Sequence, residues 1–329
     1  MGQNIKSRDI AVDVAKGIGI LLVILGHLKN PLMDFIYAFH MPLFFFVSGM
    51  FVKKGLSLGN MVIDKAKRLL IPFALYYFLV VIYKMVKLLA KGTLDLGAFS
   101  LNNPDSVFLN VGPIWFLLAL FYVFVLWIPI SRMPHLVSIA ITLMAALLPL
   151  SFYDVNPAYL SSALLALPFF VLGNCFHTMG IYTKLKSLDW KNQCTFCFTC
   201  LMFLTFTPPP TEYNQLNFNR IISTPTQYVL SGLFGTLMTI SLSIIIVSLS
   251  NRTANLFSKL GNLSLHIMAT HFYVLVALYQ VLVKLVGDKV EENMYASYFW
   301  NFIVFLASIP VCYILARLLE RYIFSKLPK

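Results

Sequence analysis

The chain has 329 residues, of which 59% are hydrophobic and only 12% are charged, and its formal net charge is +12 at neutral pH. Mean hydropathy is +0.80, which excludes an ordinary soluble domain and predicts an all-α polytopic membrane protein. The basic residues flank apolar segments, and no nucleic-acid-binding module is recognisable. Membrane topology therefore accounts for the positive charge better than a nucleic-acid partner does.

The cysteines and the N-terminus give no sign of a secreted, disulfide-bonded domain. An apolar run follows Lys6 and Arg8 without a small-residue cleavage site, which indicates a retained first helix rather than a signal peptide. The five cysteines lie in or beside apolar stretches, where no disulfide framework is expected. They are Cys175, Cys194, Cys197, Cys200 and Cys312.

Ten apolar segments approach the roughly 20 residues that a spanning helix needs. We predict helices at 10–28, 35–52, 69–89, 113–131, 133–152, 157–176, 194–207, 228–249, 261–284 and 296–318. The seventh is the shortest and ends at three consecutive prolines, 208–210. We find no internal repeat and no soluble domain, so residues 1–329 are expected to form one membrane domain.

The distribution of charge predicts the orientation of this bundle. If the N-terminus is cytoplasmic, most of the 25 lysines and arginines fall in the inner segments. The acidic residues Asp288, Glu291 and Glu292 then fall in an outer loop. By the positive-inside rule, both termini are expected in the cytoplasm.

The first segment carries polar residues within VDVAKGIGILLVILGHLKNP, residues 12–31. At 100° per residue, Asp13, Lys16 and His27 share one helix face, and about 16 Å of rise separates Lys16 from His27. Ionisable groups at membrane depth often mark function. The alternative is an interfacial Asp13–Lys16 pair at i, i+3 with a snorkelling histidine.

The second segment, FIYAFHMPLFFFVSGM, places His40 at the same outer side as His27. One such histidine is usually a packing residue. Two imidazoles at one depth on consecutive helices could share a proton, or orient one another for general-base catalysis near neutral pH.

Three further positions have both a structural and a functional interpretation. Arg68, in DKAKRLLIPF, is either a topology charge or part of a cationic mouth for a phosphate-bearing cytoplasmic ligand. Trp115 near an outer boundary fits an aromatic belt. In LGNLSLHIMATHFYV, the i, i+5 spacing of His266 and His271 does not favour a metal pair, and His271 is the deeper candidate.

Several recognisable catalytic motifs are absent from the sequence. No Walker loop, G-x-G-x-x-G, H-E-x-x-H or G-x-S-x-G sequence occurs in a supporting context. We therefore expect neither a metal cofactor nor nucleotide hydrolysis.

The motifs together resemble the membrane acyltransferase-3 family, and within it the fucose 4-O-acetylase-like and surface-polysaccharide O-acetyltransferases. The resemblance rests on D-x-x-K-G-I-x-I-L-x-V-x-x-G-H, F-x-H-M-P-L-F-F-F-x-S-G, K-R-L-x-I-P-F, P-I-W-F-L and G-N-L-S-L-x-I-M-x-x-H. It spans the whole chain, and the first two motifs together are fairly specific. The count of ten helices, obtained from hydropathy and charge, agrees with this family.

The resemblance implies an integral O-acetyltransferase of the bacterial cytoplasmic (inner) membrane. The expected donor is cytoplasmic acetyl-CoA, and the expected acceptor is a hydroxyl of a cell-surface glycan or its lipid-linked precursor. Relatives often carry an arginine where this chain has Lys16, with ten residues before the helix-1 histidine. Lysine keeps the positive charge but cannot form a bidentate contact with phosphate.

Under this interpretation the candidate residues fall into three groups. His27 acts as general base or transient acetyl carrier, and His40 assists it. Asp13, Lys16 and Arg68 form the site for the phosphates of coenzyme A.

The third group is expected to bind the acceptor: Trp115 would stack on the sugar, and His271 would line the cavity.

Two alternative functions have other consequences. A proton-coupled transporter or flippase would move substrate without acetyl-CoA, and inverted repeats are expected for it. In a purely structural membrane protein, the buried polar groups would only pair helices.

Overall fold

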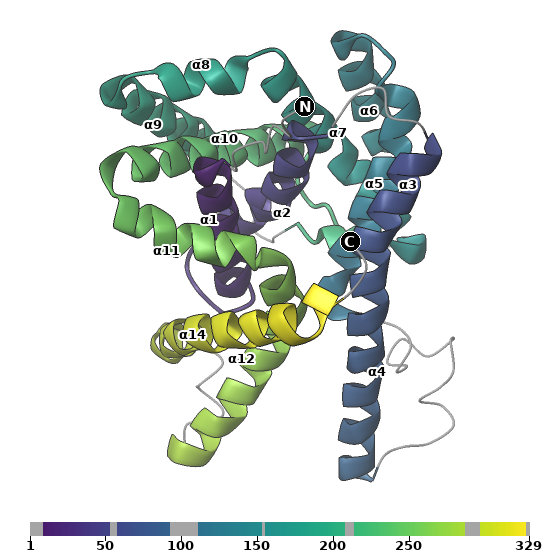
Figure 1. The fold of residues 1–329 in the computed structure, drawn as a ribbon, viewed down its shortest axis with the longest axis vertical. Helices are drawn as coiled ribbons and strands as arrows, with labels where there is room; N and C mark the ends of the chain where they lie inside the picture. Colours follow the sequence, from purple (N-terminus) through teal and green to yellow (C-terminus); the bar gives the residue numbers. More distant parts are fainter. Residues whose placement is uncertain are drawn as a thin grey trace.

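The computed structural model describes residues 9–52, 58–92, 111–152, 155–207, 214–286 and 297–326. These residues are helical almost throughout, apart from short connections and one isolated antiparallel bridge between Gln215 and Arg220 (Figure 1). Some of the charges used to predict orientation lie outside the described residues. These are Lys6, Arg8, Lys53, Lys54, Asp288, Lys289, Glu291, Glu292 and Lys329.

Each of the ten predicted segments corresponds to a helix whose ends lie within a few residues of the prediction. Short 3₁₀ turns open α5 and α7, at Gly112–Ile114 (η3) and Pro157–Tyr159 (η4). The ten helices are α1 (Ile10–Gly26), α2 (Met33–Met50), α4 (Ile71–Lys91), α5 (Trp115–Ile130), α6 (His135–Leu150), α7 (Leu160–Thr178), α9 (Trp190–Phe206), α10 (Pro225–Leu249), α12 (Ser264–Val286) and α14 (Tyr298–Tyr322).

Three connections between the predicted spanning segments also contain helices. They are α3 (Leu58–Lys65), α8 (Ile181–Ser187) and α11 (Asn251–Asn262). Helix α3 continues through one π-helical turn, η1 (Ala66–Leu70), into α4, so the three form one rod. These segments are too short or too polar to give a spanning pattern, which is why hydropathy did not find them.

Seven helical segments of the described chain are long and apolar enough to cross a membrane. They are α2, the α3–α4 rod, α5 with η3, α7 with η4, α10, α12 and α14. Helices α1, α6 and α9 have 17, 16 and 17 residues, and 17 residues rise only about 26 Å, against a hydrocarbon core of about 30 Å. A multi-pass membrane protein is supported, while ten spans and cytoplasmic termini stay predictions.

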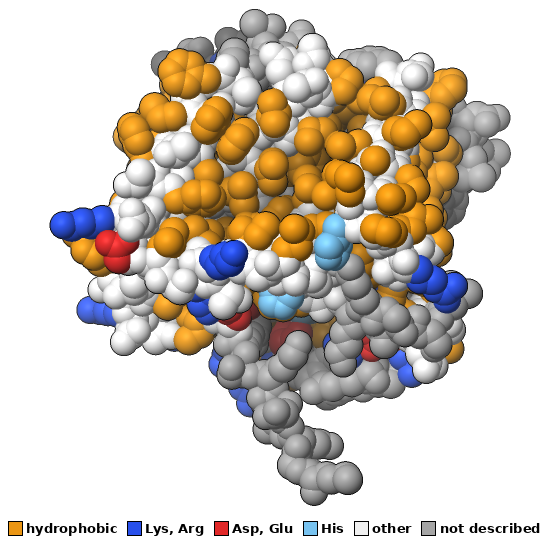
Figure 2. All heavy atoms as spheres, turned by 90° about the horizontal axis from the view of Figure 1, so that it is seen from above, with side chains coloured by type: hydrophobic (Ala, Val, Ile, Leu, Met, Phe, Trp, Pro, Cys, Tyr) orange, Lys and Arg blue, Asp and Glu red, His pale blue; other side chains and the backbone are white. Residues whose placement is uncertain are grey.

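The surface of the described chain agrees with a lipid environment. In the view of Figure 2, hydrophobic side chains cover a broad field, and the lysines and arginines that are visible gather below it. Large apolar side chains on α4 are well exposed, among them Phe78 and Leu79. Apolar exposure on this scale is expected where lipid, rather than water, is the solvent.

Helix α1 is fixed in the bundle by unusually close contact with α11. A Cβ atom on Gly17 would lie 2.1 Å from the carbonyl oxygen of Phe257, and one on Gly261 would lie 1.8 Å from that of Asp13. Only glycine permits this approach of two helix backbones. The contact sets the position of α1, and with it the positions of Lys16 and His27.

The apolar core is filled by aromatic side chains of α2, α5 and α7. Phe45 lies edge-on to Phe116, with ring centroids 4.9 Å apart, and Phe124 meets Phe170 at 5.1 Å. Such edge-to-face pairs add stability beyond the area that they bury. Helix α12 packs against α14 and α1, and this arrangement brings α12 beside the end of α1.

Candidate active site

His27 lies at the end of α1 with its tautomer fixed by the helix itself. Its Nδ1 is 2.8 Å from the carbonyl oxygen of Val23, one turn earlier. A carbonyl only accepts hydrogen bonds, so Nδ1 carries the proton, and Nε2 has a free lone pair. The ring is accessible to solvent, and in this form it is ready to take a proton from a substrate.

His271 of α12 contacts His27 directly. Its Nδ1 donates to the carbonyl oxygen of Met268 at 2.8 Å, so its Nε2 is an acceptor. That Nε2 lies 3.4 Å from Nδ1 of His27, and the two ring centroids are 4.7 Å apart in an edge-on arrangement. Fully buried His271 therefore faces the N–H of His27 and helps to orient its ring.

The ring of His40 in α2 is also held by a main-chain carbonyl of its own helix, but it is related to His27 through Tyr37. Its Nδ1 donates to the carbonyl oxygen of Ile36 at 2.8 Å, and the side chain is buried. The ring of Tyr37 lies 4.9 Å from that of His40 and 6.5 Å from that of His27, between centroids. Tyr37 therefore connects the two histidines that the sequence placed at one depth.

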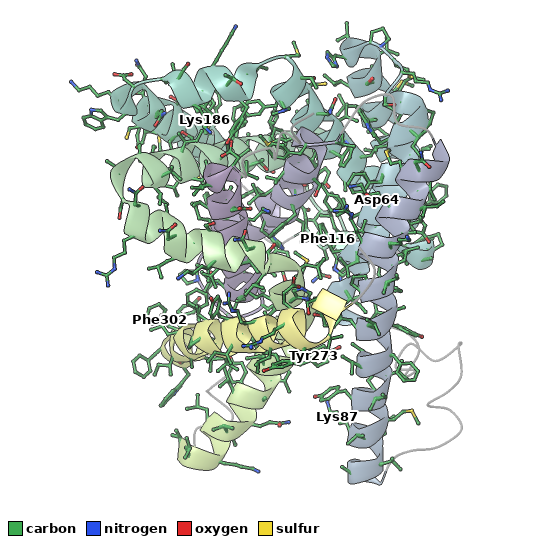
Figure 3. All side chains as sticks on the ribbon, viewed as in Figure 1. Asp64, Lys87, Phe116, Lys186, Tyr273 and Phe302 are labelled. Carbon is green, nitrogen blue, oxygen red and sulfur yellow. The ribbon has the colours of Figure 1, made fainter. Side chains whose placement is uncertain are left out.

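These three histidines line a single cavity of about 480 Å³, a size typical of small-molecule sites. Its walls come from the ends of α1 and α2, from α4, η3 and α12, and from the segment 214–218. Figure 3 shows Tyr273 on α12 and Lys87 on α4, on the sides where these helices face each other. The other lining residues with polar or aromatic side chains are Tyr37, Tyr83, Lys84, Trp115, Asn214, Gln215, Asn217, Phe218 and Phe272.

Trp115 reaches this cavity through a tight turn at the start of α5. Gly112 has a φ of +62°, a left-handed conformation that suits glycine, and Pro113 follows it at the first turn of η3. The Trp115 ring lies 6.2 Å from that of Tyr159, and its side chain is largely buried. The residue thus lies on the cavity wall as a flat apolar surface.

The segment 214–218 is a polar wall held in place by buried amides. The side-chain oxygen of Asn214 accepts from the backbone N–H groups of Ile222 and Ser223 at 2.9 and 3.2 Å. Asn219, with φ of +57°, donates to the carbonyl oxygen of Pro149 at 2.9 Å. These bonds rigidify a wall that the sequence analysis did not identify; the asparagines in EYNQLNFN are the signal that could have indicated it.

The residues that were predicted to bind the acetyl donor lie outside the histidine cavity. Lys16 and Asp13 form the expected i, i+3 ion pair, with Nζ 2.8 Å from Oδ1 and the Asp13 side chain only 4% exposed. Arg68 lies in η1, pairs with Asp64 at 2.8 Å, and keeps 65% of its side chain exposed. None of Asp13, Lys16 and Arg68 lines the histidine cavity.

The other histidine of α12 belongs to a separate cluster. His266 Nε2 lies 2.6 Å from a carboxylate oxygen of Glu320, and Nδ1 lies 2.8 Å from the hydroxyl of Tyr76. His266 and His271 thus have different partners. Across the described ranges no group of three His, Cys, Asp or Glu residues is arranged to hold a metal ion.

A family model described as an acyltransferase domain matches residues 9–317. The chain belongs to this acyltransferase family. The family resemblance based on the motifs is therefore confirmed, and the apolar helices of the described chain suit a multi-pass membrane protein.

Two similar proteins are both called nodulation protein NolL. The one from Sinorhizobium fredii is 29% identical over 232 residues, which cover 64% of this chain and 61% of that protein. The one from Mesorhizobium japonicum is 31% identical over 138 residues, covering 36% and 35% respectively. The chain therefore spans less than two thirds of these relatives. No solved structure matches it.

Proposed function

We propose that this acyltransferase is an O-acetyltransferase that transfers acetyl from acetyl-CoA to a hydroxyl of a cell-surface glycan or its lipid-linked precursor. The observation that carries the proposal is His27, whose Nε2 is unprotonated and whose ring lines a polar, aromatic cavity. Sugars are commonly bound by flat aromatic surfaces together with amide and hydroxyl groups, and Trp115, Asn217 and Tyr37 offer these.

In the direct route, Nε2 of His27 takes the proton of the acceptor hydroxyl as its oxygen attacks the thioester carbonyl. The tetrahedral intermediate then collapses, the C–S bond breaks, and coenzyme A leaves as a thiol after receiving a proton. During this step the Nδ1–H of His27 stays held by the Val23 carbonyl and Nε2 of His271. A second route forms acetyl-His27 first and uses the same nitrogen.

The remaining residues have supporting roles. His271 orients the base, and His40 supports it through Tyr37. Lys16, held by Asp13, and Arg68 are proposed to face the phosphates of coenzyme A, because both lie in segments expected at the cytoplasmic side.

The test is acetyl transfer from radiolabelled acetyl-CoA in inverted membrane vesicles supplied with a panel of surface glycans. Wild type should place label in a base-labile glycan ester, and His27→Ala should reduce transfer by about 10²-fold or more. His135→Ala is the matched control, because His135 lies outside the cavity. If His27→Ala kept wild-type turnover, the catalytic assignment would be wrong.

The same assay also separates transfer from transport. Absence of coenzyme A release with every glycan, combined with glycan movement across the vesicle membrane, would favour a transporter. Retention of acetyl label on the protein in a single turnover without acceptor would favour the acetyl-histidine route over direct transfer.

A further inference from the structure

The turn that connects α1 to α2 begins at His27 and is braced by its own asparagine. The side-chain nitrogen of Asn30 donates to the carbonyl oxygens of Leu25 and Leu28, both at 2.8 Å. Its side-chain oxygen accepts from the backbone N–H of Leu32, also at 2.8 Å. Because one side chain bonds the main chain on both sides of the turn, a displacement of any residue in the turn also displaces its neighbours.

A second asparagine, Asn301 near the start of α14, holds the same turn from outside. Its side-chain oxygen accepts from the backbone N–H of Lys29 at 3.2 Å, across 272 residues of sequence, and from the hydroxyl of Tyr279. Its side-chain nitrogen donates to the carbonyl oxygen of Ser297 at 2.7 Å. A backbone N–H only donates and a carbonyl only accepts, so the orientation of this amide is fixed. Because Asn301 is buried, loss of these bonds is costly.

Helix α12 is therefore attached to the end of α1 at two points. His271 contacts the ring of His27 directly. Tyr279 lies about two turns further along α12, at a rise of about 12 Å, and reaches Lys29 through Asn301. A single contact would leave the end of α1 able to rotate about it, whereas two separated contacts fix its direction. Tyr279 and Asn301 do not line the histidine cavity.

Building on the function proposed above, we propose that Asn301 is a positioning residue for His27. It holds the main chain two residues after His27, and so keeps the imidazole against His271 and its Nε2 available to the acceptor hydroxyl. Asn301 acts on the chemical step only through this geometry. Misplacement of a reacting group by about 1 Å can cost about 10²-fold in rate.

Two variants of the full-length protein in the vesicle assay test this role. We expect Asn301→Ala to lower kcat by about tenfold or more, and Tyr279→Phe by about threefold, with KM for acetyl-CoA within about twofold of wild type. Tyr279→Phe removes a single hydroxyl, so it keeps the test decisive where Asn301→Ala folds poorly.

Tyr228→Phe is the matched control for loss of a buried hydroxyl. The hydroxyl of Tyr228 donates to the carbonyl oxygen of Leu165 on α7 at 3.1 Å, and the side chain is fully buried. We expect this variant to lower Tm about as much as Tyr279→Phe does, because each loses one buried hydrogen bond. Its kcat should stay at the wild-type value, since the bond does not reach the turn.

Hydrogen–deuterium exchange of the peptide that contains residues 27–33 tests the attachment without acyl transfer. The amide of Lys29 should exchange about tenfold faster in Asn301→Ala, because it loses its acceptor, while peptides of α5 and α7 keep their wild-type rates. Tyr228→Phe should leave exchange of the turn unchanged.

Three results would overturn the inference. Unchanged exchange of the Lys29 amide in Asn301→Ala would mean that Asn301 does not hold the turn. Faster exchange with wild-type kcat would mean that the position of the turn does not affect the reaction. An equal loss of kcat in Tyr228→Phe would reduce the effect to general destabilisation. Absence of acetyl transfer by the wild type, with exchange as expected, would refute only the proposed function and leave the attachment of the turn to Asn301 in place.

Discussion

The two histidines of α12 lie five residues apart, yet they belong to clusters of different character. His271 donates to a carbonyl of its own helix and faces another imidazole at a cavity wall. His266 lies between a phenol and a carboxylate, with both ring nitrogens engaged, and does not line this cavity. We therefore expect the His266 cluster, whose polar groups are paired with one another, to stabilise helix packing, and the His271 cluster, which borders a cavity, to serve the proposed chemistry.

The largest difference between the clusters should appear on replacing His271 by Ala. Without its Nε2, the ring of His27 loses one of the two acceptors that hold it. We expect kcat to fall by about 10- to 100-fold with KM for acetyl-CoA little changed. His271→Gln, which keeps a polar group, should recover part of the rate. Steady-state kinetics of both variants tests this expectation. A change confined to KM would contradict a positioning role for His271.

The same substitution in the other cluster should affect stability instead. His266→Ala leaves the Tyr76 hydroxyl and the Glu320 carboxylate without their partner, at a cost of about 2 kcal/mol. Thermal unfolding in detergent should show a lower Tm, while kcat of the folded fraction stays within about twofold of wild type. A large loss of kcat at unchanged Tm would remove the distinction between the clusters.

The smallest effect is expected for Glu320→Gln. The carboxylate is 52% exposed, and glutamine still offers an oxygen to the N–H of His266, so stability should change by less than about 1 kcal/mol. Comparing the Tm of Glu320→Gln with that of His266→Ala would show how much of the stability of this cluster depends on charge. A loss as large as that of His266→Ala would mean that the ion pair, rather than the hydrogen bonds, stabilises this packing.

Local patterns predicted much of this architecture. Apolar segments located the ten helices, and i, i+3 spacing predicted the Asp13–Lys16 pair. Four predicted residues from four helices, His27, His40, Trp115 and His271, line one cavity.

What the sequence did not reveal depends on packing between distant segments. His27 and His271 are 244 residues apart, and their contact requires α12 to lie beside α1, which no local pattern specifies. Lys84 and Lys87 belong to no sequence motif, and the cavity that they line forms only where α4 and α12 face each other. The wall at 214–218 depends on buried asparagine bonds rather than on periodicity.

The main-chain carbonyl that holds each histidine of the cavity has a consequence for mutation. Val23, Ile36 and Met268 each present a main-chain oxygen to an imidazole one turn or less away. Enzymes that orient a histidine with an aspartate can lose that support through one codon change, or through protonation of the acid. Here the supporting atom belongs to the peptide bond, so substitutions at these three positions that preserve the helix leave the proton on the same nitrogen.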